Sequence, residues 1–83
     1  MVTVKHFVTI WFIILSMLVF CERLKELRES KDLSLRQLAS ALGVSAIAVS
    51  RWETGQRTPS IEQLLKIANF FGVSSDYLIG LEN

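Results

Sequence analysis

Between residues 35 and 54 the apolar residues follow two short helical periods that meet at Gly43. In the first period, Leu38, Ala39 and Leu42 lie at positions i, i+1 and i+4, so they share one face of a helix. The second period takes its apolar face from Val44, Val49 and Trp52. Because Ala39 is small and Gly43 can adopt a positive φ, two helices can cross closely there. The pattern predicts steeply crossed helices over 35–42 and 46–54.

Capping residues stand at the ends of both predicted helices. Ser34 is a favourable N-cap and forms a capping box with Gln37, while Ser45 caps the second helix. Gly55 follows the second helix as its C′ residue. These caps, spacings and the intervening glycine together predict a helix-turn-helix, an arrangement that places its second helix in a DNA groove.

Three further helices are predicted around this unit. The first covers 20–30, with Phe20, Leu24 and Leu27 on one face. Another begins after Pro59, is capped by Ser60 and Gln63, and ends near Gly72. Its predicted inward face consists of Ile61, Leu64, Leu65, Ala68 and Phe71. A short last helix follows Ser75, and its Tyr77, Ile79 and Leu81 either complete the core or form a dimer contact. The fold class is all-α, with one domain over 20–83.

The stretch 20–83 resembles the Cro/C1-type (XRE) helix-turn-helix family, compact lambda-repressor-like domains of five helices that bind DNA. The residues that carry the resemblance are ERLKELRE (22–29), SLRQLASALGVS (34–45), VSRWETGQRTPS (49–60) and LLKIANFFGVSSDYLIGLEN (64–83). These motifs cover about three quarters of the chain. They are typical of the family and of no single member.

Helix geometry predicts which side chains face DNA. If Val44, Val49 and Trp52 face the core, the opposite face of the second helix consists of Ala46, Ile47, Ser50, Arg51 and Thr54. The resemblance implies that Ala46, Ile47 and Arg51 contact bases. Arginine is the commonest partner of guanine in the major groove, and the two apolar residues suit a thymine methyl group. The alternative for Arg51 is a phosphate or solvent contact.

Phosphate contacts are expected on either side of this helix. The free N–H groups behind Ser34 and Gln37, and those behind Ser45, suit an anion. The resemblance implies that Arg57 contacts a phosphate, with Gln56 beside it, while Arg36 is either a backbone contact or a solvated charge. It also implies a structural ion pair between Arg28 and Glu53.

The first 19 residues form a separate apolar segment, with no charged residue from Phe7 to Cys21. Fifteen helical residues extend about 22 Å, which is short of a bilayer core unless the strand-like 1–4 stretch joins and Lys5 snorkels. One interpretation is a false start, with translation beginning at Met17. A second is a membrane anchor, because more basic residues follow the uncharged run than precede it, where only Lys5 and His6 lie. A packing or dimer element is the third.

Charge and composition limit the kinds of binding and catalytic site that the sequence can form. Lys5 is the one Lys or Arg before Glu22, so residues 22–83 carry eight Lys or Arg and eight Asp or Glu, out of totals of nine and eight. Tight binding to DNA through net charge alone is therefore not expected. A single cysteine and a single histidine support neither a zinc site nor a catalytic pair. We expect no enzyme and no cofactor, and the single cysteine fits a reducing cytoplasm.

The function expected from these features is sequence-specific regulation of transcription. The expected form is a repressor that binds double-stranded DNA at a palindromic operator as a homodimer. One alternative is an antitoxin that binds a toxin and represses its own operon. The other is a membrane-tethered adaptor with a protein partner, with its helix-turn-helix domain in the cytoplasm.

Overall fold

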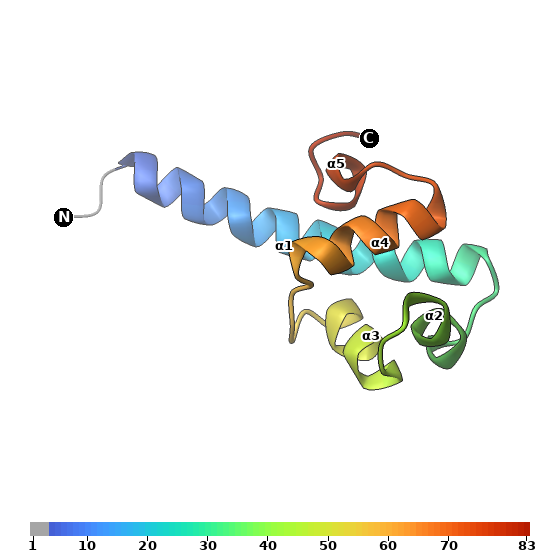
Figure 1. Ribbon diagram of the computed structural model, residues 1–83. Helices are drawn as coiled ribbons and strands as arrows, with labels where there is room; N and C mark the ends of the chain where they lie inside the picture. The colour runs from blue at the N-terminus through green and yellow to red at the C-terminus, as the bar shows by residue number, and fades with distance from the viewer. Residues whose placement is uncertain (1–3) are drawn as a thin grey trace.

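The computed structural model describes the backbone of residues 4–83 and the side chains from residue 8 onward. Its described part is all-helical, with α1 (Val4–Ser30), α2 (Leu35–Leu42), α3 (Ala46–Glu53), α4 (Ile61–Phe71) and α5 (Ser75–Leu78). In Figure 1, α2 to α5 gather around the C-terminal half of α1. The N-terminal half of α1 projects away from them. The all-α, five-helix fold is confirmed.

The ends of α2 and α3 follow the local signals in the sequence. Ser34 caps α2 in extended conformation, and its capping box with Gln37 is complete. Gly43 ends α2 with φ 71°, and the N–H of Val44 donates to the Ala39 carbonyl at 3.0 Å. This left-handed residue, which costs glycine little, reverses the chain toward α3 within three residues.

One apolar core joins the helices. It consists of Phe20, Leu24, Leu38, Ala39, Leu42, Val49, Trp52, Ile67, Ala68, Phe71 and Leu78. Phe20 and Leu24 supply the face of α1 that the sequence predicts, while Leu27 is half-buried beside them. Because α1 contacts both α3 and α5, it links the helix-turn-helix unit to the C-terminal helix.

The predicted inward face of α4 is partly wrong. Ile61 and Leu65 are 79% and 55% exposed, whereas Ile67, which the prediction omitted, is fully buried. Ala68 and Phe71 are buried as expected, and Leu64 is half-buried. Apolar residues occupy so many positions of α4 that its sequence fits more than one helical phase. Packing against α2 and α5 selects the phase.

The first helix begins at Val4, far before the predicted Phe20, so the apolar segment and the first helix of the domain form one continuous helix. We call its projecting part, residues 8–18, the arm. Residues 1–3 and the side chains of Lys5 and His6, on which the strand and membrane-flank hypotheses depend, lie outside the described residues. Among the helices that are described, none combines the length and the apolar character needed to cross a bilayer.

The C-terminal residues are held against α1. Arg23 places its guanidinium carbon 4.3 Å from the centre of the Tyr77 ring, and it donates hydrogen bonds to the carbonyls of Tyr77 and Glu82. Ser74 rather than Ser75 caps α5, one residue earlier than predicted. Tyr77 and Ile79 are half-buried, and Leu81 is 51% exposed.

Candidate nucleic-acid interface

The inner face of α3 fixes the direction of its outer face. Val49 is fully buried and Trp52 is 1% exposed, so both side chains point into the core as predicted. The Ser45 hydroxyl caps α3 by accepting a hydrogen bond from the N–H of Ala48 at 3.1 Å. A helix of eight residues that is capped and anchored in this way presents its remaining side chains outward in a defined register.

Ile47 and Arg51 are the two predicted base-contacting residues that are exposed. Ile47 is 64% exposed, and Arg51 lies one turn further along the same face. No hydrogen bond or ion pair of the Arg51 guanidinium occurs within the described part of the chain. Five donors are therefore available to an outside acceptor. An apolar contact and a forked donor one helical turn apart match the edges of neighbouring bases.

The other predicted members of this face are less available. Ala46 is half-buried against the core rather than fully exposed, and Ser50 is half-buried too. The hydroxyl of Thr54 donates to the Ser50 carbonyl at 3.0 Å, so it is turned back toward its own helix. Thr54 is the C-cap of α3, one residue beyond the helix, which was predicted to include it.

The N-terminus of α2 offers unpaired donors beside α3. Gln37 donates its N–H to the Ser34 hydroxyl at 3.0 Å, and its side-chain oxygen accepts from the Ser34 N–H at 2.8 Å. This reciprocal pair satisfies two backbone groups and holds both side chains at the helix end. The N–H groups of Leu35 and Arg36 have no partner within the described chain. They suit a phosphate oxygen.

The loop after α3 is tied to that helix. The N–H groups of Gln56 and Arg57 both donate to the Arg51 carbonyl, at 2.9 and 3.2 Å. The side chains of Gln56 and Arg57 are exposed. The backbone therefore places the Arg57 loop at the end of α3, while its charged side chain is free to reach a neighbouring molecule.

Arg28 and Glu53 are joined across α1 and α3. Arg28 donates from Nε to Glu53 Oε2 at 2.7 Å and from Nη2 to Oε1 at 3.0 Å, and the side chains are only 15% and 7% exposed. A third bond runs from Nη1 to the Leu33 carbonyl at 2.8 Å. The hydrogen bond with Glu53 raises the pKa of Arg28 above its ordinary value. The pair thus fixes both the end of α3 and the entry to α2.

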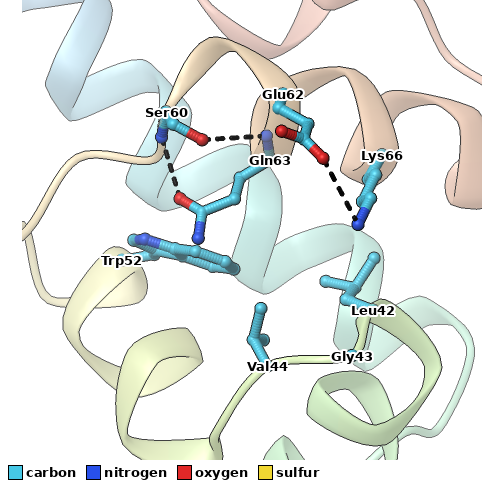
Figure 2. A pocket seen from close by; sticks show the side chains of 8 residues that line it. All are labelled: Leu42, Gly43, Val44, Trp52, Ser60, Glu62, Gln63 and Lys66. Carbon is cyan, nitrogen blue, oxygen red and sulfur yellow. Dashed lines mark hydrogen bonds and ion pairs between the residues drawn. The ribbon is translucent and has the colours of Figure 1, made fainter.

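Behind α3 lies a cavity of about 220 Å³, bounded by the Gly43 turn and the N-terminal end of α4 (Figure 2). In the figure, Gln63 lies between its capping partner Ser60 and the Trp52 ring. The indole nitrogen of Trp52 is buried and has no hydrogen-bond partner within the described chain. Trp52 is therefore held by packing, and a role in stacking on bases is excluded by its burial.

The charge of the domain is unevenly distributed. Residues 34–60 contain Arg36, Arg51 and Arg57 against a single acidic residue, Glu53, which is paired with Arg28. The remaining acidic residues lie on α1, the turn after it, α4 and the C-terminal region. The neutral charge of the whole domain hides this local excess, although counting charges over the helix-turn-helix segment alone finds it. A locally basic, exposed segment is the electrostatic pattern expected of a DNA-binding surface.

Comparison with known proteins also identifies a helix-turn-helix domain. A sequence profile of the helix-turn-helix family matches residues 24–78. The chain belongs to the Cro/C1-type helix-turn-helix family. The match runs from α1 to α5, so it covers the ion pair, the α2–α3 unit and the loop after it.

Cro/C1-type relatives include both activators and repressors. The chain is 44% identical over 63 residues to the HTH-type transcriptional activator BcrR of Enterococcus faecalis, covering 76% of this chain and 31% of BcrR. It is 31% identical over 55 residues to the phage transcriptional repressor RstR of Vibrio cholerae, covering 66% of this chain and 50% of RstR. The chain spans about a third to just over half the length of the curated relatives it matches.

The fold also matches solved structures of the Cro/C1-type family. The restriction-modification controller protein C.AhdI of Aeromonas hydrophila superimposes with a TM-score of 0.68 at 35% identity, covering 75% of this chain and 94% of that protein. A transcriptional regulator from Listeria innocua gives a TM-score of 0.71 at 33% identity, covering 77% of this chain and 60% of that one.

Proposed function

We propose that this chain is a sequence-specific DNA-binding regulator that represses transcription as a homodimer at a palindromic operator. The observation that carries the proposal is the orientation of α3. Its Val49 and Trp52 are buried, and its Ile47 and Arg51 stand exposed on the opposite side. In a helix-turn-helix this outward face of the second helix enters the major groove.

In this proposal Arg51 reads guanine and Ile47 contacts a thymine methyl group. Backbone phosphates are held by Arg57, by the exposed Gln56 and by the N-terminus of α2 next to Ser34 and Gln37. Ser45, Ala46, Ser50 and Thr54 support the helix more than they reach the bases. Arg28 and Glu53 act indirectly, because they set the angle between α3 and α1.

Repression is supported by the transcriptional repressor RstR among the relatives. A domain that only occupies its site can exclude polymerase, whereas activation needs a further contact. The homodimer supplies two copies of a weakly basic interface, and their half-sites would lie about 34–36 Å apart on one face of the duplex.

Selection of binding sites from random double-stranded DNA tests this function. The full chain should enrich a palindrome whose half-sites are separated by about one helical turn. A guanine in each half-site should become variable when the selection is repeated with Arg51→Ala. Enrichment of no sequence, or of a sequence without two-fold symmetry, would contradict the proposed function.

A further inference from the structure

The arm leaves a large apolar surface uncovered. Nine large apolar side chains between Val8 and Leu18 are 37 to 59% exposed. At about 200 Å² for each such side chain, this is on the order of 900 Å² per copy. One partner in a stable protein interface contributes roughly 800 Å². The exposed area is therefore large enough for an interface and too large for an ordinary isolated surface.

The apolar surface continues from the arm onto the folded domain. Phe12, Ile13 and Met17 of the arm border a groove of about 270 Å³ whose other wall contains Leu64 and Ile79. The remaining lining residues are Ser16, Phe20, Thr58 and Pro59. Among the residues whose side chains are described, no charged one lines this groove.

The exposed residues of α4 extend this groove. Ile61 and Leu65, which are 79% and 55% exposed, lie three residues before and one residue after the groove residue Leu64. Helical spacing places both on the side of α4 away from Gln63 and Lys66, which face the other cavity. The apolar surface is thus built from the arm and from α4 together, so its occupant must fit a shaped protein groove.

We propose that the groove receives the arm of a second copy of this chain, so that two copies exchange their arms reciprocally. An exchange of this kind is isologous, because each copy gives one arm and offers one groove. The arm is the matching occupant: all of its residues except Thr9 and Ser16 are large and apolar, and it has no charged residue from Val8 to Cys21. Its groove-lining face, with Phe12, Ile13 and Met17, can fill a partner's groove and contact the same face of the partner's arm, while Leu18 stays outside the contact.

The direction of the arm agrees with two copies that read DNA together. In Figure 1 the arm runs sideways from the domain, and α2 and α3 lie together below α1. A two-fold axis that is perpendicular to the arm and parallel to the direction from α1 toward α3 makes the arms antiparallel and places both α3 helices on the same side of the dimer. This inference rests on the proposed function, because it names the surface through which the DNA-reading dimer forms.

Sedimentation equilibrium of the full chain tests the exchange with a matched pair of variants. Ile13 lies in the groove and is 54% exposed, while Leu18 points to the opposite side of the helix and is 59% exposed. Ile13→Glu should raise the dimer dissociation constant about 10-fold or more, because it places a charge at the centre of the interface. Leu18→Glu should change it within about 3-fold, as expected of a peripheral position.

A wild-type chain that stays monomeric at all concentrations, or equal effects of the two variants, would overturn the arm exchange. Flotation of the wild-type chain with phosphatidylcholine vesicles in place of self-association would also overturn it, in favour of a lipid surface. If circular dichroism shows that Ile13→Glu lowers the helix content, Met17→Gln on the same face is the variant to compare with Leu18→Glu.

Binding to a DNA duplex that carries one half-site separates the two proposals. Ile13→Glu should bind the half-site like the wild type and lose only the cooperative binding of two half-sites. If the wild-type chain dimerises through the arm but binds no DNA, the proposed function fails while the arm exchange stands.

Discussion

Arg28 and Glu53 lie 25 residues apart in the chain and form a nearly buried, two-pronged ion pair with N–O distances of 2.7 and 3.0 Å. The same guanidinium bonds to the Leu33 carbonyl just before α2. One side chain of α1 therefore positions both helices of the helix-turn-helix unit. Its partner on α3 follows directly after Trp52, which anchors that helix in the core.

Removing one member of this pair should destabilise the domain strongly. Glu53→Ala leaves the Arg28 guanidinium poorly solvated and unpaired, at a cost of about 3 kcal/mol in the free energy of unfolding. Glu62→Ala is the matched control, because the Glu62–Lys66 pair is 3.8 Å apart and largely exposed. Its loss should change stability by less than about 0.5 kcal/mol. Urea unfolding measures both, and equal effects would refute the structural role of Glu53.

Substitution of Trp52 should cost little stability when mainly the N–H is lost, and much more when most of the side-chain volume is lost. The indole nitrogen has no hydrogen-bond partner within the described chain, so Trp52→Phe removes no such bond. We expect a cost below about 1.5 kcal/mol for Trp52→Phe and about 3–5 kcal/mol for Trp52→Ala. Thermal or urea unfolding followed by circular dichroism measures the difference. A large cost for the phenylalanine variant would indicate that the N–H has a partner in solution.

Substitutions of Gly43 should lower the stability through backbone strain rather than through steric crowding. Its φ is 71°, and a Cβ built there meets no atom within 4 Å. Gly43→Ala should therefore cost about 1 kcal/mol through left-handed strain alone. Gly43→Asn should cost less, because asparagine adopts this conformation more readily. If both variants unfold at the same urea concentration as the wild type, the turn has relaxed to another conformation.

The thiol of Cys21 gives a pH-dependent contribution to stability. Burial raises the pKa of this thiol, and a backbone hydrogen bond opposes the effect without cancelling it. A pKa that is higher in the folded state means that the stabilisation is complete below the unfolded pKa and is lost as pH rises through the folded pKa. The thiolate absorbance should therefore appear at higher pH in the native chain than in urea. Identical titration midpoints in the native chain and in urea would contradict this. Cys21→Ser, which has no thiol, gives the background absorbance.

Arg57 should act on DNA through charge alone. Arg57→Ala is expected to weaken binding to all sequences alike and to reduce the salt dependence of the binding constant by about one counterion. Binding titrations at several salt concentrations measure this slope. The matched control is Lys66→Ala, an exposed cation on α4 beside the cavity of Figure 2. An unchanged slope for Arg57→Ala would remove this residue from the interface.

The helix-turn-helix unit could be predicted because its determinants are local. Ser34, Gln37, Gly43 and Ser45 mark the helix ends through bonds within a few residues, and these ends lie where the sequence places them. The phase of α4 could not be predicted in the same way. It depends on how α4 packs against distant helices, which buries Ile67 and exposes Leu65.

Two features of the site also depend on the tertiary structure. The bond from Arg28 to the Leu33 carbonyl joins a side chain to a turn whose path is fixed only by the folded chain. Ala46 is half-buried because it packs against the core, a tertiary contact that the helical period of α3 alone does not specify. Which residues contact DNA stays a prediction for every member of the proposed interface.

The most direct test of the central claim is fluorescence anisotropy of the full chain on its selected operator and on a scrambled duplex, at two salt concentrations. We predict that the wild type prefers the operator at both. Arg51→Ala should lose about 1–3 kcal/mol on the operator and little on the scrambled duplex. Equal losses on both duplexes, or no preference by the wild type, would contradict base reading by the outer face of α3.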